Sequence, residues 1–233
     1  MLETLLHLFK QCPKLAILMS GEGSNARFLL KNRSRYPNLN FSAIATDNPG
    51  SNAESLAKEF NLAWKCFPEP FKGPENRQKR FEEIASYLES MQIDALIYSG
   101  FMKIAPSFFV EKFPGLNIHP ADLTIKDNEG IPLYRGIDAV QMAVENGEST
   151  LASTIHIVEN RVDCGAPIAV SNPLSISEYS HLSIKEIHDK LKSECEHALF
   201  SDTLEILSKG SLAPSDLPIN PSSWQLRDSA LQK

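Results

Sequence analysis

No run of apolar residues in this chain approaches the roughly 20 that a membrane-spanning helix requires. Positive charge is also scarce: 23 Lys and Arg stand against 29 Asp and Glu, so the formal net charge is −6 at pH 7. This charge is unlike that of proteins that coat nucleic acids, although it leaves room for a local pocket that binds a small anion. With 42% apolar and 22% charged residues, the 233-residue chain is predicted to be globular, without nucleic-acid or membrane partners.

Cysteine is rare as well, with four residues at positions 12, 66, 164 and 195. They form no C-x-x-C pair and have no histidine at zinc-ligand spacing. The chain also lacks an H-E-x-x-H motif, a Walker loop and a carboxylate cluster with metal-ligand spacing. We therefore expect reduced thiols, a cytoplasmic protein and no bound metal.

Short apolar runs alternate with segments of helical periodicity through the first hundred residues. Strands are expected at 14–20, 41–47, 62–67 and 94–101, and helices at 24–36, 51–61 and 77–91. Ser24 and the pair Ser51 and Glu54 are the expected N-terminal caps of the first two of these helices. This alternation predicts an α/β fold with a doubly wound, mostly parallel sheet, whose ligands bind beyond the carboxyl ends of the strands.

The remaining segments have other patterns. Leucines and a phenylalanine at helical spacing predict an amphipathic helical extension at 1–13, before a main domain at 14–210. Two β runs within 153–174 predict an antiparallel hairpin, and 183–210 has the period of a long helix. Residues 124–135 are polar and read as a loop, and the Pro- and Ser-rich 211–233 are expected to be loosely ordered.

The first candidate binding feature is the glycine loop at 21–25, between a strand and a helix. Gly23, Ser24 and Asn25 would offer backbone N–H groups at a helix N-terminus, which is a favourable site for a phosphate. The loop also fits G-x-G-x-x-A, with Asp47 placed where a dinucleotide-binding acid would lie. A nicotinamide-dependent oxidoreductase therefore remains open at this point.

The second candidate is Asn117 with His119, at the end of a predicted strand. Residues two apart in a strand face the same way, so a carboxamide donor and an imidazole would point together into the cleft. Such a pair suits the stabilisation of a developing oxyanion. Asp163 lies in the turn of the predicted hairpin, where it either forms the turn or, if folded toward the cleft, raises the pKa of His119 and relays protons.

Together these motifs resemble the folate-dependent formyltransferase superfamily, over roughly residues 14–170. The matching segments are LAILMSGEGSNARFLL, IATDNPGSNAESLAKEF, DALIYSGFMKIAPSFFVEKFPGLNIHPADL and AVENGESTLASTIHIVENRVDCGAPI. In particular, the chain resembles the members that formylate glycinamide ribonucleotide, and EHALFSDTLEIL resembles their final helix.

The resemblance implies formyl transfer from 10-formyltetrahydrofolate, a co-substrate, to a primary amine in purine biosynthesis, by a monomer or a homodimer. It implies a catalytic role for Asn117, His119 and Asp163, and phosphate binding by Gly23, Ser24 and Asn25. The folate would lie along Met102, Lys103, Ile104 and Ala105 and would also contact Asn117. The family uses the same glycine loop for a substrate phosphate, which weakens the dinucleotide reading.

The chain departs from the family pattern at two places. After NIHP it continues with ADLT and a longer polar loop, KDNEGIPLYRG, on the side of the amine substrate. The arginine expected near the folate tail has no clean match, since Gln78 falls at its place between Arg77 and Arg80. A sugar-nucleotide N-formyltransferase therefore remains the alternative, with a non-catalytic folate-binding protein behind it.

Overall fold

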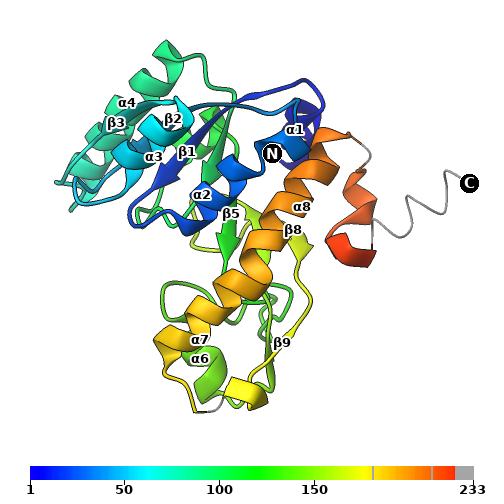
Figure 1. The fold of residues 1–233 in the computed structure, drawn as a ribbon. Coiled ribbons are helices and arrows are strands. Elements are labelled where there is room, and N and C mark those ends of the chain that lie inside the picture. The colour runs from blue at the N-terminus through cyan, green and yellow to red at the C-terminus, as the bar shows by residue number, and fades with distance from the viewer. Residues whose placement is uncertain (180, 211, 224–233) are drawn as a thin grey trace, which may run out of the picture.

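A seven-stranded sheet forms the centre of the computed structural model, which describes residues 1–179, 181–210 and 212–223 (Figure 1). The strand order is β3-β2-β1-β4-β5-β7-β8; β1 to β5 pair in parallel, and β7 and β8 run antiparallel. These strands are β1 (Lys14–Met19), β2 (Asn40–Thr46), β3 (Ala63–Cys66), β4 (Ala95–Tyr98), β5 (Gly115–His119), β7 (Thr154–Ile157) and β8 (Pro167–Val170). The predicted doubly wound sheet with an antiparallel hairpin is confirmed.

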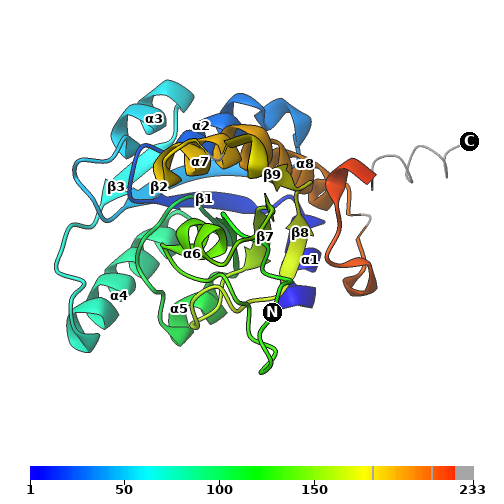
Figure 2. The same cartoon turned by 90° about the horizontal axis from the view of Figure 1, so that it is seen from below.

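Helices cover both faces of this sheet, with α2, α3 and α8 on one side and α4 and α5 on the other (Figure 2). The helices are α1 (Leu2–Phe9), α2 (Ser24–Lys31), α3 (Ala53–Phe60), α4 (Pro74–Ser90), α5 (Ser107–Lys112), α6 (Ala139–Glu145), α7 (Ile184–Leu191) and α8 (His197–Ser208). A third core cluster joins α6 and α7 to a small antiparallel sheet of β6 (Thr150–Leu151) and β9 (Leu174–Ser175).

Strand β1 illustrates why an uninterrupted apolar run forms a central strand. Its side chains alternate between the two faces, so Leu15 and Ile17 join the core under α2 and α8, whereas Ala16 and Leu18 join the core under α4. Because helices cover both faces, every second position needs an apolar side chain on each side, and no polar alternation remains.

The N-terminal helix α1 is part of the core on the α8 side. Leu5, Leu6 and Phe9 are buried in the same cluster as α8 residues, whereas Thr4 and His7 are exposed. The apolar face of α1 therefore packs on the domain, as the leucine spacing predicts.

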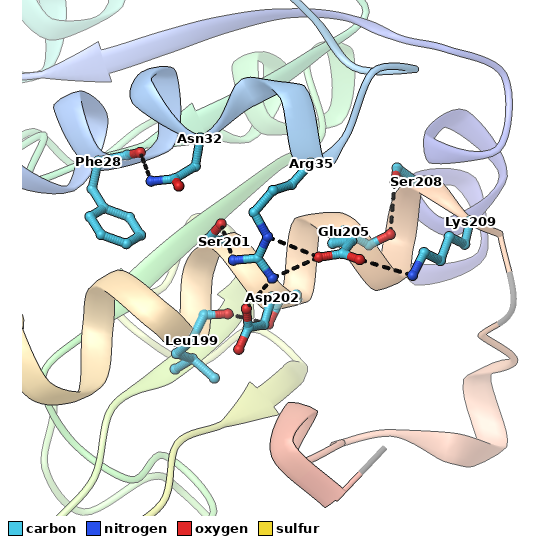
Figure 3. A network of polar contacts seen from close by, with 10 residues as sticks. Phe28, Asn32, Arg35, Leu199, Ser201, Asp202, Glu205, Ser208 and Lys209 are labelled. Atoms are coloured by element: carbon cyan, nitrogen blue, oxygen red, sulfur yellow. Dashed lines mark hydrogen bonds and ion pairs between the residues drawn. The ribbon is translucent and has the colours of Figure 1, made fainter. Parts of the chain in front are cut away.

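Helices α2 and α8 are held together by polar contacts at their outer end (Figure 3). Arg35, in a 3₁₀ turn after α2, donates to Ser201 Oγ (3.1 Å), Asp202 Oδ1 (2.6 Å) and Glu205 Oε2 (2.6 and 3.0 Å). At the start of α8, the Phe28 ring of α2 stacks on His197 with centroids 4.8 Å apart. The Arg35 side chain is partly exposed, so these ion pairs fix the relative position of the helices more than they add stability.

The structure differs from the sequence expectations in three local features. Helix α2 already includes Ser24, with Gly23 as its N-cap, and α3 is preceded by Asn52 without a side-chain cap, so the predicted Ser24 and Ser51 caps are wrong. The long C-terminal helix contains a π-helical turn at Lys192–Glu196, between α7 and α8. Within 212–223, Leu212 and Ile219 are buried, so this part of the segment expected to be loose packs on the domain.

Truncation of Phe9 tests whether α1 stabilises the domain. We expect Phe9→Ala to lower the free energy of unfolding by about 3–5 kcal/mol, because it empties a fully buried aromatic site. Urea unfolding followed by circular dichroism measures this loss. The matched control is Thr4→Ala on the exposed face of α1, which should change stability by no more than about 0.5 kcal/mol. Equal losses in the two variants would contradict the packing described here.

Candidate active site

The candidate site lies beyond the carboxyl ends of β1, β4 and β5. The strand order reverses between β1 and β4, because the chain adds β2 and β3 on one side of β1 and then β4 and β5 on the other. Ligands of open α/β sheets bind at such switch points. The glycine loop follows β1, and Asn117 and His119 lie at the end of β5.

A buried carboxylate, Asp163, connects the polar side chains at the end of β5. Its Oδ2 atom accepts from the backbone N–H of Gly136 (2.8 Å) and lies 3.3 Å from His119 Nδ1. Its Oδ1 atom lies 3.5 Å from His156 Nε2. Asn117 Nδ2 in turn lies 3.1 Å from the same His156 nitrogen. The structure therefore brings together Asn117, His119 and Asp163, and adds His156 to them.

The backbone of the β7–β8 loop carries Asp163 to this position. Asp163 has a φ of +50°, in the left-handed region that aspartate tolerates better than most residues. Two residues later the loop passes so close to β7 that a Cβ atom on Gly165 would lie 1.8 Å from the Ile157 carbonyl oxygen. Asp163 is thus a turn residue and a site residue at once, so the two readings of the sequence are compatible.

The pKa values of the two central groups shift downward. Burial by itself raises the pKa of Asp163, but the imidazoles of His156 and His119 and the Gly136 N–H outweigh it and lower this pKa to about 2. A hydrogen bond or a positive charge from an imidazole favours the ionised form of a carboxyl group, which explains their effect.

Burial also lowers the pKa of His119, and the charge of Asp163 and the Tyr134 carbonyl, which both favour the imidazolium, do not offset it. The expectation that Asp163 raises the pKa of His119 thus holds for that contact but not for the net shift. At pH 7 the pair consists of an ionised Asp163 and a His119 that can take up a proton.

The Tyr134–Gly136 segment, at the end of the polar loop, also contacts the site. His119 Nε2 donates to the Tyr134 carbonyl (2.7 Å), and Tyr134 OH donates to Glu148 (2.5 Å). Before it, residues 126–132 form a narrow turn closed by a bridge between Lys126 and Pro132. The loop that departs from the family pattern is therefore attached directly to His119 and Asp163.

The glycine loop places Gly23, Ser24 and Asn25 at the N-terminus of α2. Gly23 has a φ of +70°, and a Cβ atom there would lie 2.6 Å from the Met19 side chain and 2.8 Å from that of Leu56. The first N–H groups of a helix have no intrahelical partner, so they are available to an anion. The Asn25 side chain is turned inward, where Nδ2 donates to the buried Glu196 (2.7 Å).

Asp47 does not have the surroundings of a dinucleotide-binding acid. It is buried, accepts from Ser20 Oγ (2.5 Å) and lies 3.3 Å from Lys103 Nζ. Ser20 Oγ also accepts from the Met102 N–H (3.0 Å). Asp47 therefore links the glycine loop to the segment after β4 and is not free to bind a ribose hydroxyl.

The Met102–Ala105 segment presents apolar side chains beside this link. Met102 and Ile104 are 65% and 46% exposed, which is high for large apolar residues, whereas Ala105 is buried. Lys103 pairs with Glu69 as well as Asp47 and lies over the Phe71 ring. An apolar ring system can contact such a surface while polar groups at its edge meet the backbone.

Sequence reasoning missed His156 and Glu196. A single histidine in a strand is usually structural, and only the strand register, which pairs His156 with Asn117, indicates otherwise. Glu196 is one of several acidic residues in a long helix, and its burial raises its pKa. The Gly136 N–H and the Tyr134 carbonyl are backbone groups, which no side-chain motif identifies.

In the described residues, no three His, Cys, Asp or Glu side chains gather as a group that could hold a metal ion. Among the same residues, no helix combines the length and apolarity needed to cross a bilayer.

Comparison with known proteins gives consistent matches over most of the chain. The formyl transferase family matches residues 13–204. The chain is 25% identical over 207 residues to the phosphoribosylglycinamide formyltransferase of Haemophilus influenzae, covering 87% of this chain and 91% of that protein. It is 27% identical over 205 residues to the enzyme of the same name from Bacillus subtilis, covering 86% and 99%.

Solved structures match the fold. The glycinamide ribonucleotide transformylase 1 of Symbiobacterium toebii superposes with a TM-score of 0.75 at 21% identity, covering 89% of this chain and 92% of that one. At this identity the match establishes the fold.

The low pKa of Asp163 predicts a specific acid dependence of stability. The folded-state pKa of about 2 lies below the ordinary 3.8, so the ionised carboxylate stabilises the fold by about 2 kcal/mol above pH 4. This contribution is lost as the pH falls from about 4 through about 2, because the unfolded chain takes up the proton first. Urea unfolding of the wild type and Asp163→Asn should give stability differences that shrink over this range. A difference that stays constant from pH 5 to pH 2 would show that Asp163 is not held this way.

Proposed function

The chain belongs to the formyl transferase family, and we propose that it transfers the formyl group of 10-formyltetrahydrofolate to the primary amine of glycinamide ribonucleotide. The relatives that match nearly their whole length are phosphoribosylglycinamide formyltransferases, which supports this acceptor and a role in purine biosynthesis. We further propose that the enzyme acts in the cytoplasm, as a monomer or a homodimer.

The observation that carries the proposal is the convergence of Asn117, His119 and Asp163 at the end of β5. Attack of an amine on a formyl carbon forms the new C–N bond and leaves negative charge on the carbonyl oxygen. The Asn117 amide donates a hydrogen bond to that oxygen, and a proton taken up by His119 places positive charge beside it. The substrate amine is itself the nucleophile, so the site needs no nucleophilic side chain.

His119 and Asp163 move the proton that the reaction releases. His119 Nε2 donates to the Tyr134 carbonyl, so in the neutral imidazole the free lone pair is on Nδ1, which faces Asp163 Oδ2 at 3.3 Å. This pair accepts the proton lost by the attacking amine. The proton is then delivered to N10 of the folate as the bond between N10 and the formyl carbon breaks, giving tetrahydrofolate and the formamide product.

The binding roles follow the position of each segment. Gly23, Ser24 and Asn25 hold the substrate phosphate on the free N–H groups of α2. The exposed apolar side chains of Met102–Ala105 lie along the folate, whose formyl end reaches Asn117. These assignments place the two substrates on neighbouring strand ends, which are linked through Ser20 and Asp47.

Turnover of the two substrates tests the function. Purified protein is mixed with 10-formyltetrahydrofolate and glycinamide ribonucleotide, and the loss of formyl-folate is followed by absorbance. We expect turnover in the wild type and a loss of about 10²–10³ in kcat for Asn117→Ala, because one oxyanion donor is removed. His119→Ala should lose at least as much, whereas the control His181→Ala, in an exposed turn, should match the wild type. Full activity in His119→Ala would refute the mechanism.

The same assay distinguishes the remaining acceptor. The loop at 124–135 contains Tyr134, which contacts His119, and is followed by Gly136, which contacts Asp163, so a different acceptor would be accommodated there. If formyl-folate binds but glycinamide ribonucleotide gives no turnover, the acceptor is wrong and an amino-sugar nucleotide is the next candidate to assay.

The phosphate role of the glycine loop is tested by a pair of glycine variants. Gly23→Ala should raise the KM for glycinamide ribonucleotide at least about tenfold, because a Cβ atom at φ +70° meets Met19 and Leu56 and displaces the loop. The KM for formyl-folate should change little. Gly21→Ala is the matched control, since nothing lies within 4 Å of a Cβ atom there. Equal effects of both substitutions on both KM values would contradict the assignment.

A further inference from the structure

We propose that His156 is a positioning residue, which orients the Asn117 carboxamide so that one of its N–H groups faces the carbonyl oxygen of the transferred group. The proposal rests on the proposed formyl transfer for its catalytic consequence. Its structural part, the hydrogen bond between His156 and Asn117, is tested independently of activity.

The strand pairing brings these two side chains together. Asn117 on β5 and His156 on β7 are directly opposite each other in the antiparallel ladder, so their side chains emerge on the same face. Asn117 Nδ2 and His156 Nε2 are 3.1 Å apart, and the His156 side chain is only 3% exposed. His156 is thus enclosed by the fold, whereas the half-buried Asn117 can still face a substrate.

The contact of His156 Nδ1 determines whether Nε2, which faces Asn117, donates or accepts a hydrogen bond. Nδ1 lies 2.9 Å from the carbonyl oxygen of Ile157, which can only accept a hydrogen bond, so Nδ1 carries a hydrogen. In the neutral imidazole, Nε2 then has a lone pair and can only accept. The group of Asn117 that faces it must therefore be the NH₂ end of the carboxamide.

The orientation of the Asn117 carboxamide determines which hydrogen bond it can make to a substrate. One N–H is used by His156, and the second N–H of the same nitrogen remains to donate to an oxyanion. Were the carboxamide reversed, its oxygen would stand where the second N–H is needed and would repel the developing negative charge. The energy that Asn117 supplies in the transition state therefore depends on a residue that does not itself touch the substrate.

Asp163 is held separately from this pair. Its closest contact to His156 is 3.5 Å, longer than the 2.8 Å bond from the Gly136 N–H, and it shares its second oxygen with His119. In the neutral tautomer with its hydrogen on Nδ1, His156 has no N–H to give Asp163, so in this form its effect on the reaction should pass through Asn117. The effects of substituting His156 and Asn117 should therefore not be additive in a double-mutant analysis.

Two substitutions at His156 distinguish the effect of its hydrogen-bond acceptor from the effect of its side-chain volume. The amide oxygen of glutamine can reach the position of Nε2 and accept from Asn117, whereas leucine fills the space without an acceptor. We expect His156→Leu to lower kcat by about 10- to 100-fold, a part of the loss on removing an oxyanion donor, with the KM for formyl-folate little changed. His156→Gln should recover most of the lost kcat. In the Asn117→Ala background, His156→Leu should cost no more than about twofold, because the residue it orients is gone.

A control and a direct readout complete the test. Ile155→Val, a buried β7 residue on the opposite face, should leave kcat unchanged, which excludes a general effect of perturbing the strand. In ¹⁵N spectra of the neutral imidazole at pH 8, His156 should show a protonated Nδ1 and an unprotonated Nε2 whose shift changes in Asn117→Ala.

A protonated Nε2 overturns the inference whether or not the enzyme accepts glycinamide ribonucleotide. In an active enzyme, wild-type kcat in His156→Leu, no recovery in His156→Gln, or an undiminished loss in the Asn117→Ala background also overturns it. A wild type without turnover refutes the proposed function alone, and the ¹⁵N spectra then decide this inference.

Discussion

The antiparallel pairing of β5 with β7 is the constraint on which the site depends. It sets Asn117 opposite His156 and His119 opposite Thr154, so that polar side chains gather on one face of a sheet that is otherwise apolar. A slip of one residue would turn each of these side chains to the other face. The pairing also starts the loop that returns Asp163 to the same face, since that loop connects β7 to β8. The strand register thus determines which polar side chains of β5 and β7 lie together on this face.

A second constraint joins segments that are far apart in the chain. Helix α2 follows the glycine loop, whereas α8 comes at the end of the domain. The two are connected at their N-terminal ends by Asn25 and Glu196, and beyond the C-terminal end of α2 by Arg35. The π-helical turn lies just before α8 and includes Glu196. Such turns in a helix are often found at functional sites. These contacts couple the N-terminus of α2 to α8, which helps to hold the glycine loop in position.

The parts of the molecule that the sequence predicts are those governed by local pattern. Strand β1 is predictable because both of its faces are buried, and the Asn117–His119 pair because residues two apart share a face. His156 is not, because its importance depends on register with a strand 39 residues away. Likewise, a neighbouring carboxylate predicts a raised His119 pKa, but the net shift is downward since it depends on how completely other segments enclose the ring. The predicted caps at Ser24 and Ser51 are wrong because the loops before these two helices hydrogen-bond to each other. The Asn52 N–H, for example, donates to the Gly21 carbonyl.

The edge of the sheet beyond β8 is closed by a segment from much later in the chain. Ile219 N–H donates to the Ile168 carbonyl (3.0 Å), and the Val170 N–H donates to the Ile219 carbonyl (2.9 Å). An uncovered edge strand is a template for pairing with other chains, and β8 is synthesised well before the residues that cover it. A chain in which β8 has formed but residue 219 has not yet docked therefore has a free sheet edge, so this late contact also protects the fold against pairing with other chains.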